Sequence, residues 1–294
     1  MIILKLKGGL GNQLFQYAYA LNLSYLTRKS IAIDSYSGFE NDFYKRKFVL
    51  NKFQITTISK LYSHKLKNYW LINKLSRTYD LLFRSFINRK YINEVNFHFD
   101  KKLLQIRRKK EIHVEGYFQS YKYFGEISSE LKNLYKLKNK YKTKDFYELE
   151  KKIKNSCSVA VHIRDYSFNG SNNDDLIYKS CSSDFYKKSI DLIKNKFKNP
   201  LFFIFSDNLN FAKSVYPSIN SNSIFVSNLS DCEDLTLMSY CNHNIISNST
   251  FSWWGAWLNL NKNKIVIGPE EWFLDENKTT KDLYPDSWIK ISNN

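Results

Sequence analysis

Ile245 to Leu258 read Ile-Ile-Ser-Asn-Ser-Thr-Phe-Ser-Trp-Trp-Gly-Ala-Trp-Leu. The two β-branched residues at the start are typical of the end of a buried strand. Four small polar residues follow, and then an apolar stretch that predicts a helix over 253–258. Hydroxyl and amide side chains before a helix can cap its free N–H groups, and the same N–H groups can bind an anion. Both a phosphate cradle and an ordinary strand-to-helix turn fit; taken alone, the ordinary turn is the simpler explanation.

The rest of the second half alternates apolar strands with helices. We predict strands over 158–164, 201–205, 224–226 and 264–267, and helices over 184–196 and 231–241. This alternation is typical of a parallel sheet covered by helices. Three of its strands end in Arg164, Asp207 and Ser247, and ligands of open parallel sheets bind at that carboxyl edge.

Two polar side chains lie at the end of the apolar strand 158–164. His162 and Arg164 alternate and therefore face the same side. Buried polar groups are costly unless they are bonded, and the planar fork of arginine suits a diphosphate. The alternatives are a core histidine bonded to a carbonyl and a buried ion pair of Arg164 with Asp165 or Asp207.

The chain opens with a strand over 2–6, a helix over 14–21 and a strand over 31–34, which again indicates a parallel sheet. The connection between the first strand and the helix is Gly8-Gly9-Leu10-Gly11-Asn12-Gln13. Its glycines let the backbone approach a ligand closely, but the spacing is not that of a dinucleotide fingerprint. The amides of Asn12 and Gln13 lie near the helix start, where they could bond a phosphate or hydroxyl or simply complete a tight turn.

Ser59 to Ile92 are basic, with eight Lys and Arg against one Asp and apolar residues at roughly helical spacing. We interpret this region as a core-packed helix with a solvated basic face, and a helix lying on an anionic membrane is the alternative. Lys132 to Lys154 are predicted to be helical. We place a domain boundary near the end of that helix, which gives domains 1–150 and 151–294.

Composition limits the classes of function. The 294 residues carry 45 Lys and Arg against 28 Asp and Glu, a net charge of +17, which favours anionic partners. No ordered arrangement of Arg and aromatic residues typical of a nucleic-acid module is present. The four cysteines have no metal-site spacing, and no apolar run approaches the roughly 20 residues of a membrane span. We expect a cytoplasmic protein, with peripheral contact with the inner face of the cell membrane left open.

Four stretches carry a family resemblance. They are Gly8 to Ala18, Glu115 to Ser120, Phe205 to Asp207 and Ser247 to Leu258. In this order they resemble the motifs of the α-1,2-fucosyltransferases of glycosyltransferase family 11. The resemblance implies a GT-B architecture, in which two Rossmann-like domains face each other across a cleft: an acceptor-side N-terminal domain and a C-terminal domain that binds the GDP-sugar.

One motif departs from the family pattern. The family usually has His-x-Arg-Arg-Gly-Asp-Tyr, whereas this chain has His162-Ile163-Arg164-Asp165-Tyr166. His162 and Arg164 match directly, and Asp165 matches the motif's Asp only across a gap. The role of Asp165, and with it the acceptor and linkage, is therefore left open.

The resemblance implies inverting transfer of L-fucose from GDP-fucose to a galactose hydroxyl, without a metal or other cofactor. The expected acceptor is a surface polysaccharide or oligosaccharide, with a lipid-linked form as one alternative. Arg164, His162 and Asp165 are the expected catalytic residues. The expected donor-binding residues are Gly11, Asn12, Gln13, Ser206, Asp207, Asn248, Ser249, Thr250 and Phe251.

Two rival functions remain. One is another GDP-sugar transferase or a fucosyltransferase of different linkage, including the protein O-fucosyltransferase type. The other is a basic nucleic-acid-binding protein, which only the net charge supports.

Overall fold

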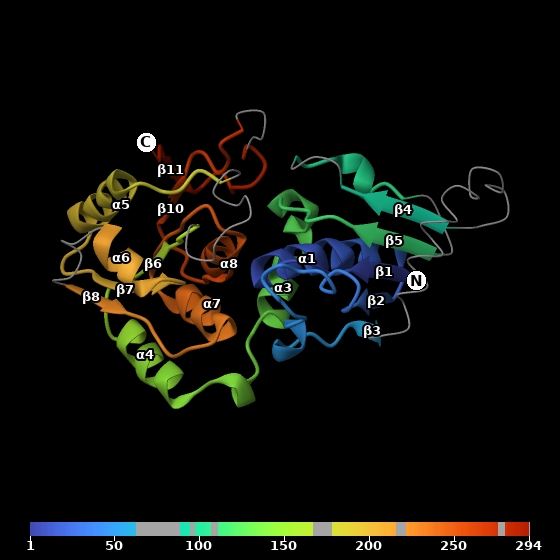
Figure 1. The fold of residues 1–294 in the computed structure, drawn as a ribbon, viewed down its shortest axis with the longest axis horizontal. Helices are drawn as coiled ribbons and strands as arrows, with labels where there is room; N and C mark the ends of the chain where they lie inside the picture. Colours follow the sequence, from blue (N-terminus) through green and yellow to red (C-terminus); the bar gives the residue numbers. More distant parts are fainter. Residues whose placement is uncertain are drawn as a thin grey trace. The chain divides into compact units, whose positions relative to one another are not determined.

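The chain forms two compact units, Met1–Tyr135 and Lys136–Asn294. The fold is that of a computed structural model, which describes residues 1–62, 89–94, 98–106, 111–166, 178–215, 222–275 and 280–293. Each unit is built on its own parallel β-sheet, as Figure 1 shows. The predicted α/β class with two Rossmann-like domains is therefore confirmed.

The first unit contains a five-stranded sheet in the order β3-β2-β1-β5-β4, with every pair parallel. Its strands are β1 (Ile2–Lys5), β2 (Ile31–Asp34), β3 (Ile58–Tyr62), β4 (Arg89–Asn93) and β5 (Glu111–Glu115). Its helices are α1 (Leu10–Thr27) and α3 (Ser128–Leu134), with short 3-10 turns at Leu50–Lys52, Lys101–Leu103, Tyr121–Tyr123 and Gly125–Ile127. The first strand lies at the centre, so its carboxyl end lies between those of β2 and β5.

Helix α1 is the central core element of the first unit. Every residue from Leu10 to Leu23 except Asn12 is buried, as expected for a helix that is apolar on all sides. The ring of Tyr19 stacks on Phe118 with centroids 3.8 Å apart, and its hydroxyl donates to the carbonyl of Leu103 at 2.6 Å. These contacts tie the 116–120 loop and the 3-10 turn at Lys101–Leu103 to the helix.

The second unit contains a six-stranded parallel sheet in the order β11-β10-β9-β6-β7-β8. Its strands are β6 (Ser158–Ile163), β7 (Leu201–Ser206), β8 (Ser223–Phe225), β9 (His243–Ile245), β10 (Val266–Pro269) and β11 (Ile289–Ile291). Its helices are α4 (Lys144–Lys154), α5 (Ser183–Lys196), α6 (Leu209–Val215), α7 (Asp231–Tyr240) and α8 (Thr250–Leu258), with a 3-10 turn at Asn139–Tyr141.

Helices cover both faces of this second sheet. Val159 and Val161 of β6 pack with α5 and α6, whereas Ala160 between them packs with α4 and α7. Successive side chains of a strand point to opposite faces, so both faces of a central strand must be apolar. His162, two residues after Ala160, continues on the face of α4 and α7.

Tryptophans form a cluster around α8. The ring centroid of Trp253 lies 5.0 Å from Trp254, 6.0 Å from Trp257 and 5.5 Å from Trp288. The indole N–H of Trp253 donates to the carbonyl of Leu283 at 2.9 Å. The cluster thus packs α8 against the C-terminal segment.

The structure differs from the sequence prediction between residues 132 and 154. In place of one helix, α3 ends at Leu134 and α4 begins at Lys144. Thr143 caps α4, because its hydroxyl accepts from the amide of Phe146 at 3.3 Å, while its own amide donates to Glu233 at 2.8 Å. Because α4 packs into the core of the second unit, the boundary along the chain lies between Tyr135 and Lys136 and not near residue 150.

The basic region predicted to be a helix over 59–92 is described only at its ends. Residues 58–62 form β3 and residues 89–93 form β4, so these ends are strands. The expected helix between them, residues 63–88, lies outside the described residues. Across the part of the chain that the structure describes, no helix combines the length and apolar character needed to cross a membrane.

We predict that Gly255→Ala destabilises the second unit. A Cβ atom there would lie 2.9 Å from the Cβ of Met238 in α7, a contact that neither helix can relieve without moving. The expected cost is about 1–3 kcal/mol, even though alanine favours a helix over glycine. Calorimetric melting of the full chain measures it. Gly125→Ala is the matched control, because a Cβ there meets nothing within 4 Å; an equal melting temperature for both variants would contradict the packing argument.

Candidate functional site

Polar residues collect at the carboxyl edge of the second sheet. Arg164 follows β6, Asp207 follows β7, and Ser247 to Ser249 follow β9. Because β6 lies between β7 and β9, these three connections are neighbours. The structure therefore brings the predicted residues of the second unit together.

Arg164 and Asp207 form an ion pair. An NH1 nitrogen of Arg164 lies 2.6 Å from a carboxylate oxygen of Asp207, and the other oxygen accepts from the amide of Asp165 at 3.1 Å. Burial raises the pKa of Asp207, and the positive charge of Arg164 opposes that rise. The Arg164 side chain is 29% exposed, so it can meet a ligand without leaving the pair.

Asp165 lies inside the same group of loops. It is buried, and its carboxylate accepts from the Asn208 side-chain amide at 2.9 Å. Ser206 accepts from the Asn208 backbone amide at 3.1 Å, which closes the turn after β7. Both predicted residues thus hold the turn that presents Asp207, and their roles toward a substrate stay predictions.

His162 is buried and bonded to a hydroxyl. Its Nδ1 lies 2.7 Å from the Oγ of Ser247, and its ring centroid lies 5.4 Å from that of Phe251. Burial, followed by the charge of Arg164, lowers the pKa of His162 to about 3. The imidazole is therefore neutral at pH 7 and can act as a hydrogen-bonding group but not as a cation.

The strand-to-helix turn 247–250 is held from several sides. Ser249 is the N-cap of α8 and accepts from the amide of Phe251 at 3.3 Å, and Thr250 begins the helix. Asn248 is buried, and its side-chain amide donates to the carbonyls of Lys179 at 2.7 Å and Trp272 at 3.1 Å. The turn is thus fixed, with the α8 N-terminus beside His162.

The first unit carries the other predicted residues at the start of α1. Gln13 is fully buried; its amide nitrogen donates to the carbonyls of Gly8 at 3.0 Å and Lys47 at 2.8 Å, and its oxygen accepts from Val49. Asn12 is half-buried and accepts from Gln119 at 3.1 Å. Gly11 is buried in the first turn. Gln13 therefore holds the glycine loop in place, and Asn12 is the more accessible of the two amides.

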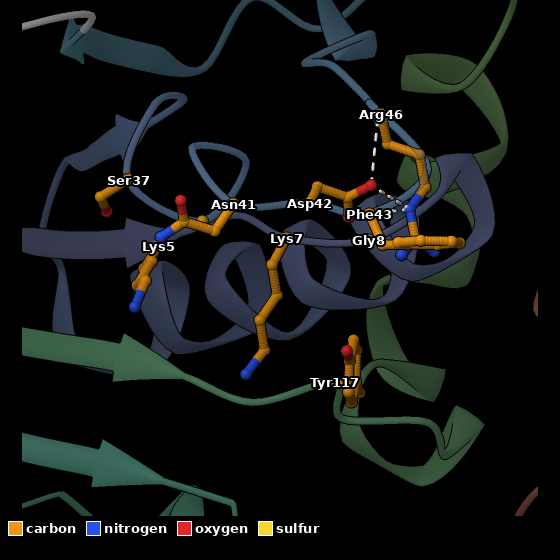
Figure 2. Close-up of a pocket in the computed structure, with 10 residues that line it drawn as sticks. Lys5, Lys7, Gly8, Ser37, Asn41, Asp42, Phe43, Arg46 and Tyr117 are labelled. Atoms are coloured by element: carbon orange, nitrogen blue, oxygen red, sulfur yellow. Dashed lines mark hydrogen bonds and ion pairs between the residues drawn. The ribbon is translucent and has the colours of Figure 1, made fainter. Parts of the chain in front are cut away.

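A pocket of about 310 Å³ lies at the carboxyl edge of the first sheet (Figure 2). Lys5, Lys7, Arg46 and Tyr117 contribute to its lining. None of these four residues is among the site residues predicted from the sequence. The sequence does contain a pattern that indicates Lys5 and Lys7. They alternate at the end of the first apolar strand, as His162 and Arg164 do in the second half.

The sequence profile of Glycosyl transferase family 11 matches residues 1–292. The chain belongs to this family. The O-antigen biosynthesis glycosyltransferase WbnK of Escherichia coli is 30% identical, and the alignment covers 97% of this chain and 99% of WbnK. An α-1,2-colitosyltransferase of Escherichia coli is 31% identical, with 99% of each chain covered. The protein is thus a glycosyltransferase of family 11.

Solved structures of fucosyltransferases share the fold of this family 11 enzyme. NodZ from Bradyrhizobium gives a TM-score of 0.52 at 14% identity, over 86% of this chain and 91% of NodZ. A variant of FUT1 from Arabidopsis thaliana in complex with GDP gives 0.54 at 11% identity, over 97% of this chain and 74% of FUT1. At this identity the likeness concerns the fold alone, which is GT-B as predicted.

We predict that His162 lowers the free energy of unfolding of the glycosyltransferase as the pH falls below 6.5. The unfolded chain binds a proton near pH 6.5, whereas the folded imidazole stays neutral down to about pH 3. The unfolded state therefore holds more protons in this window, and stability decreases as the pH falls through it. At pH 5 the loss from this residue is about 2 kcal/mol.

The test compares urea unfolding of the native chain and of His162→Gln between pH 7.5 and 4.5. The difference in stability between the two proteins at each pH isolates the contribution of His162. Buried carboxyls with raised pKa values increase the stability as the pH falls, but they do so in both proteins. The same pH slope in both proteins would contradict the buried, neutral imidazole.

Proposed function

We propose that the enzyme transfers L-fucose from GDP-fucose to a galactose hydroxyl of a glycan, with an α-1,2 linkage and inversion. The observation that carries this proposal is the partly exposed Arg164 at the carboxyl edge of the second sheet, the edge at which α8 also begins. That edge combines a guanidinium held by Asp207 with the N-terminal end of a helix, whose positive dipole end favours an anion, and both suit a diphosphate. Membership of family 11 and the fucosyltransferase fold support the donor class.

The donor's parts have separate binding groups in this proposal. Arg164 binds the diphosphate together with Ser249 and Thr250 at the start of α8. Asp207, already fixed by Arg164, accepts from the ribose hydroxyls or from guanine N–H groups. Phe251 is half-buried next to His162 and packs on the base or sugar. Asn12, from the first unit, bonds an oxygen of the β-phosphate.

The chemistry follows from the growth of charge on the leaving group. As GDP departs, negative charge accumulates on the β-phosphate, and a preorganised guanidinium stabilises it without reorienting. The pair with Asp207 holds the fork of Arg164 in place before the substrate arrives. We propose that this stabilisation suffices without a metal. The neutral His162 donates or accepts a hydrogen bond but adds no charge.

Removal of the acceptor proton needs a base. Asp165 is the acidic residue of the altered motif, but it is buried and accepts from Asn208. Because Asp165 is only 5% exposed, an acceptor hydroxyl would reach its carboxylate only after the surrounding loops move. We therefore propose that Asp165 acts as the base only after such a rearrangement. Without it, Asp165 stabilises the turn that carries Asp207 through its hydrogen bond with Asn208.

GDP-colitose is the alternative to GDP-fucose as the donor. The relative named an α-1,2-colitosyltransferase is 31% identical over nearly the whole chain, as similar as WbnK. This favours the 1,2 linkage and makes colitose the alternative donor sugar. The name of WbnK supports a surface polysaccharide as the acceptor, and contact with the membrane that carries a lipid-linked form belongs to the same proposal.

We predict that GDP raises the melting temperature of the enzyme and that UDP and ADP at the same concentration do so much less. GDP-fucose should release GDP when galactose-terminated oligosaccharides are added, in buffer with excess EDTA. Equal stabilisation by UDP would contradict the guanine assignment. Turnover with GDP-colitose alone would select the alternative sugar, and loss of activity in EDTA that Mn²⁺ restores would contradict the metal-free mechanism.

We predict that Arg164→Ala lowers kcat by about 10²–10³, the range typical of one preorganised electrostatic donor. Arg164→Lys should also fail, because a point charge does not replace the fork. Melting curves and initial rates are measured on the same preparations.

Two further variants separate the roles of Arg164. Asp207→Asn breaks the same ion pair but leaves the guanidinium, so its melting temperature without nucleotide reports the structural contribution of the pair. Lys188→Ala removes an exposed cation that pairs with Asp184 on α5 and is the neutral control. An Arg164→Ala variant that melts lower but keeps its rate would refute the catalytic assignment.

A further inference from the structure

The 116–120 loop of the first unit is held in an unusual backbone conformation. Phe118 has a φ of 52°, in the left-handed region that residues other than glycine seldom adopt. The amides of Phe118 and Tyr117 both donate to one carboxylate oxygen of Glu94, at 2.8 and 2.7 Å, and the ring of Phe118 stacks on Tyr19. Backbone conformations that the surrounding contacts enforce in this way are concentrated at functional sites. The residue that this loop presents is therefore a candidate for a functional role.

The loop presents Gln119 to the start of α1. Gln119 is buried, and its side-chain amide nitrogen donates to the side-chain oxygen of Asn12 at 3.1 Å. The backbone amide of Ser120 donates to the carbonyl of Phe118 at 2.8 Å, which closes a tight turn around Gln119. Because the residues on both sides of Gln119 are bonded in place, its side chain starts from a fixed point and can hold Asn12 in one position.

Other glutamines hold the backbone next to Asn12. The side chain of Gln16 donates to the carbonyl of Lys7 at 2.8 Å and accepts from the amide of the same residue at 3.0 Å. Together with the bonds of Gln13 described above, this fixes the glycine loop before α1. These bonds act on the backbone and do not set the side-chain torsion angles of Asn12. The hydrogen bond from Gln119 does set them.

The same bond decides which end of the Asn12 amide faces the glycine loop. The oxygen of Asn12 accepts from Gln119, and its nitrogen lies on the side of Gly8, where an added Cβ atom would be 2.8 Å from it. Gly8 has a φ of 80° and no side chain, so the amide can lie against its backbone. An amide nitrogen donates hydrogen bonds, whereas phosphate oxygens accept them. This orientation therefore turns the end of Asn12 that suits a phosphate toward the glycine loop.

We propose that Gln119 is a positioning residue for the β-phosphate of the donor. It holds the oxygen of Asn12, so that the amide nitrogen of Asn12 donates to a phosphate oxygen. Without Gln119 the amide can rotate and offer its oxygen, which repels the phosphate. Gln119 does not touch the donor and acts only through Asn12. The inference rests on the proposed function in one respect, that Asn12 bonds the β-phosphate.

The experiment measures the affinities of the full chain for GDP and GMP by isothermal titration calorimetry. GMP lacks the β-phosphate, so the ratio of the two dissociation constants reports the contacts of that phosphate. We expect Gln119→Met to lower the preference for GDP about three- to tenfold, the equivalent of one ordinary hydrogen bond, and to leave GMP binding unchanged. Gln119→Ala is the second variant, should the methionine side chain pack poorly. An equal loss of affinity for both nucleotides would indicate a structural role and overturn the proposal.

A double-mutant cycle separates positioning from direct contact. Asn12→Ala should lower the preference for GDP about tenfold, because it removes a hydrogen bond to a charged group. If Gln119 acts through Asn12, Gln119→Met has no further effect in the Asn12→Ala background. An undiminished effect in that background would show that Gln119 contacts the phosphate itself and would overturn the positioning role. Gln105→Met is the matched control, an exposed glutamine of the same unit, and should leave the ratio unchanged.

The same titrations distinguish failure of this inference from failure of the proposed function. An unchanged ratio in both Gln119 variants, while Asn12→Ala still loses the preference for GDP, refutes the role of Gln119 alone. A native chain that does not bind GDP refutes the donor assignment, and the inference with it. An Asn12→Ala variant that keeps the full preference refutes the contact between Asn12 and the β-phosphate, and thereby the inference, but not GDP as the nucleotide.

Discussion

The candidate donor site depends on the side chain of Asn248. Its amide nitrogen donates to two backbone carbonyls from separate segments, at Lys179 and Trp272, and the backbone carbonyl of Asn248 accepts from the hydroxyl of Tyr166 at 2.6 Å. Because the Asn248 side chain and the Tyr166 hydroxyl are buried, leaving these groups unpaired would cost about 1–3 kcal/mol each. The turn between β9 and α8 therefore has one conformation. That conformation places Ser247 against His162 and starts α8 at the carboxyl edge of the sheet.

Much of the fold follows from local patterns in the sequence. The strand at Ile31–Asp34 and the helices near 184–196 and 231–241 were predicted within one residue, because apolar periodicity there agrees with the packing. The break before α4 was not predictable, since the partner of Thr143 is Glu233, far along the chain. The short strand β11 was missed for a similar reason: it forms by pairing with β10, and three residues carry little periodic signal.

The sequence predicts at which edge of the second sheet the site lies, but it does not predict which residues contact one another there. Arg164, Asp207 and Ser247 each end a parallel strand, and parallel strands end at one edge. Which carboxylate pairs with Arg164 depends on the register that sets Ile163 opposite Ser206, and this brings Asp207 into reach ahead of Asp165. Likewise, nothing local separates Gln13 from Asn12. The difference arises because residues 47–49 fold back over Gln13 alone.

The indole cluster on α8 gives the protein an optical signature that belongs to one unit. Five of the six tryptophans lie in Lys136–Asn294, and Trp253 and Trp254 are close enough, at 5.0 Å between centroids, for their electronic transitions to couple. Their near-ultraviolet circular dichroism therefore reports the arrangement of α8 itself. Since the first turn of this helix borders the proposed diphosphate position, a shift in that dichroism follows nucleotide binding without any attached label.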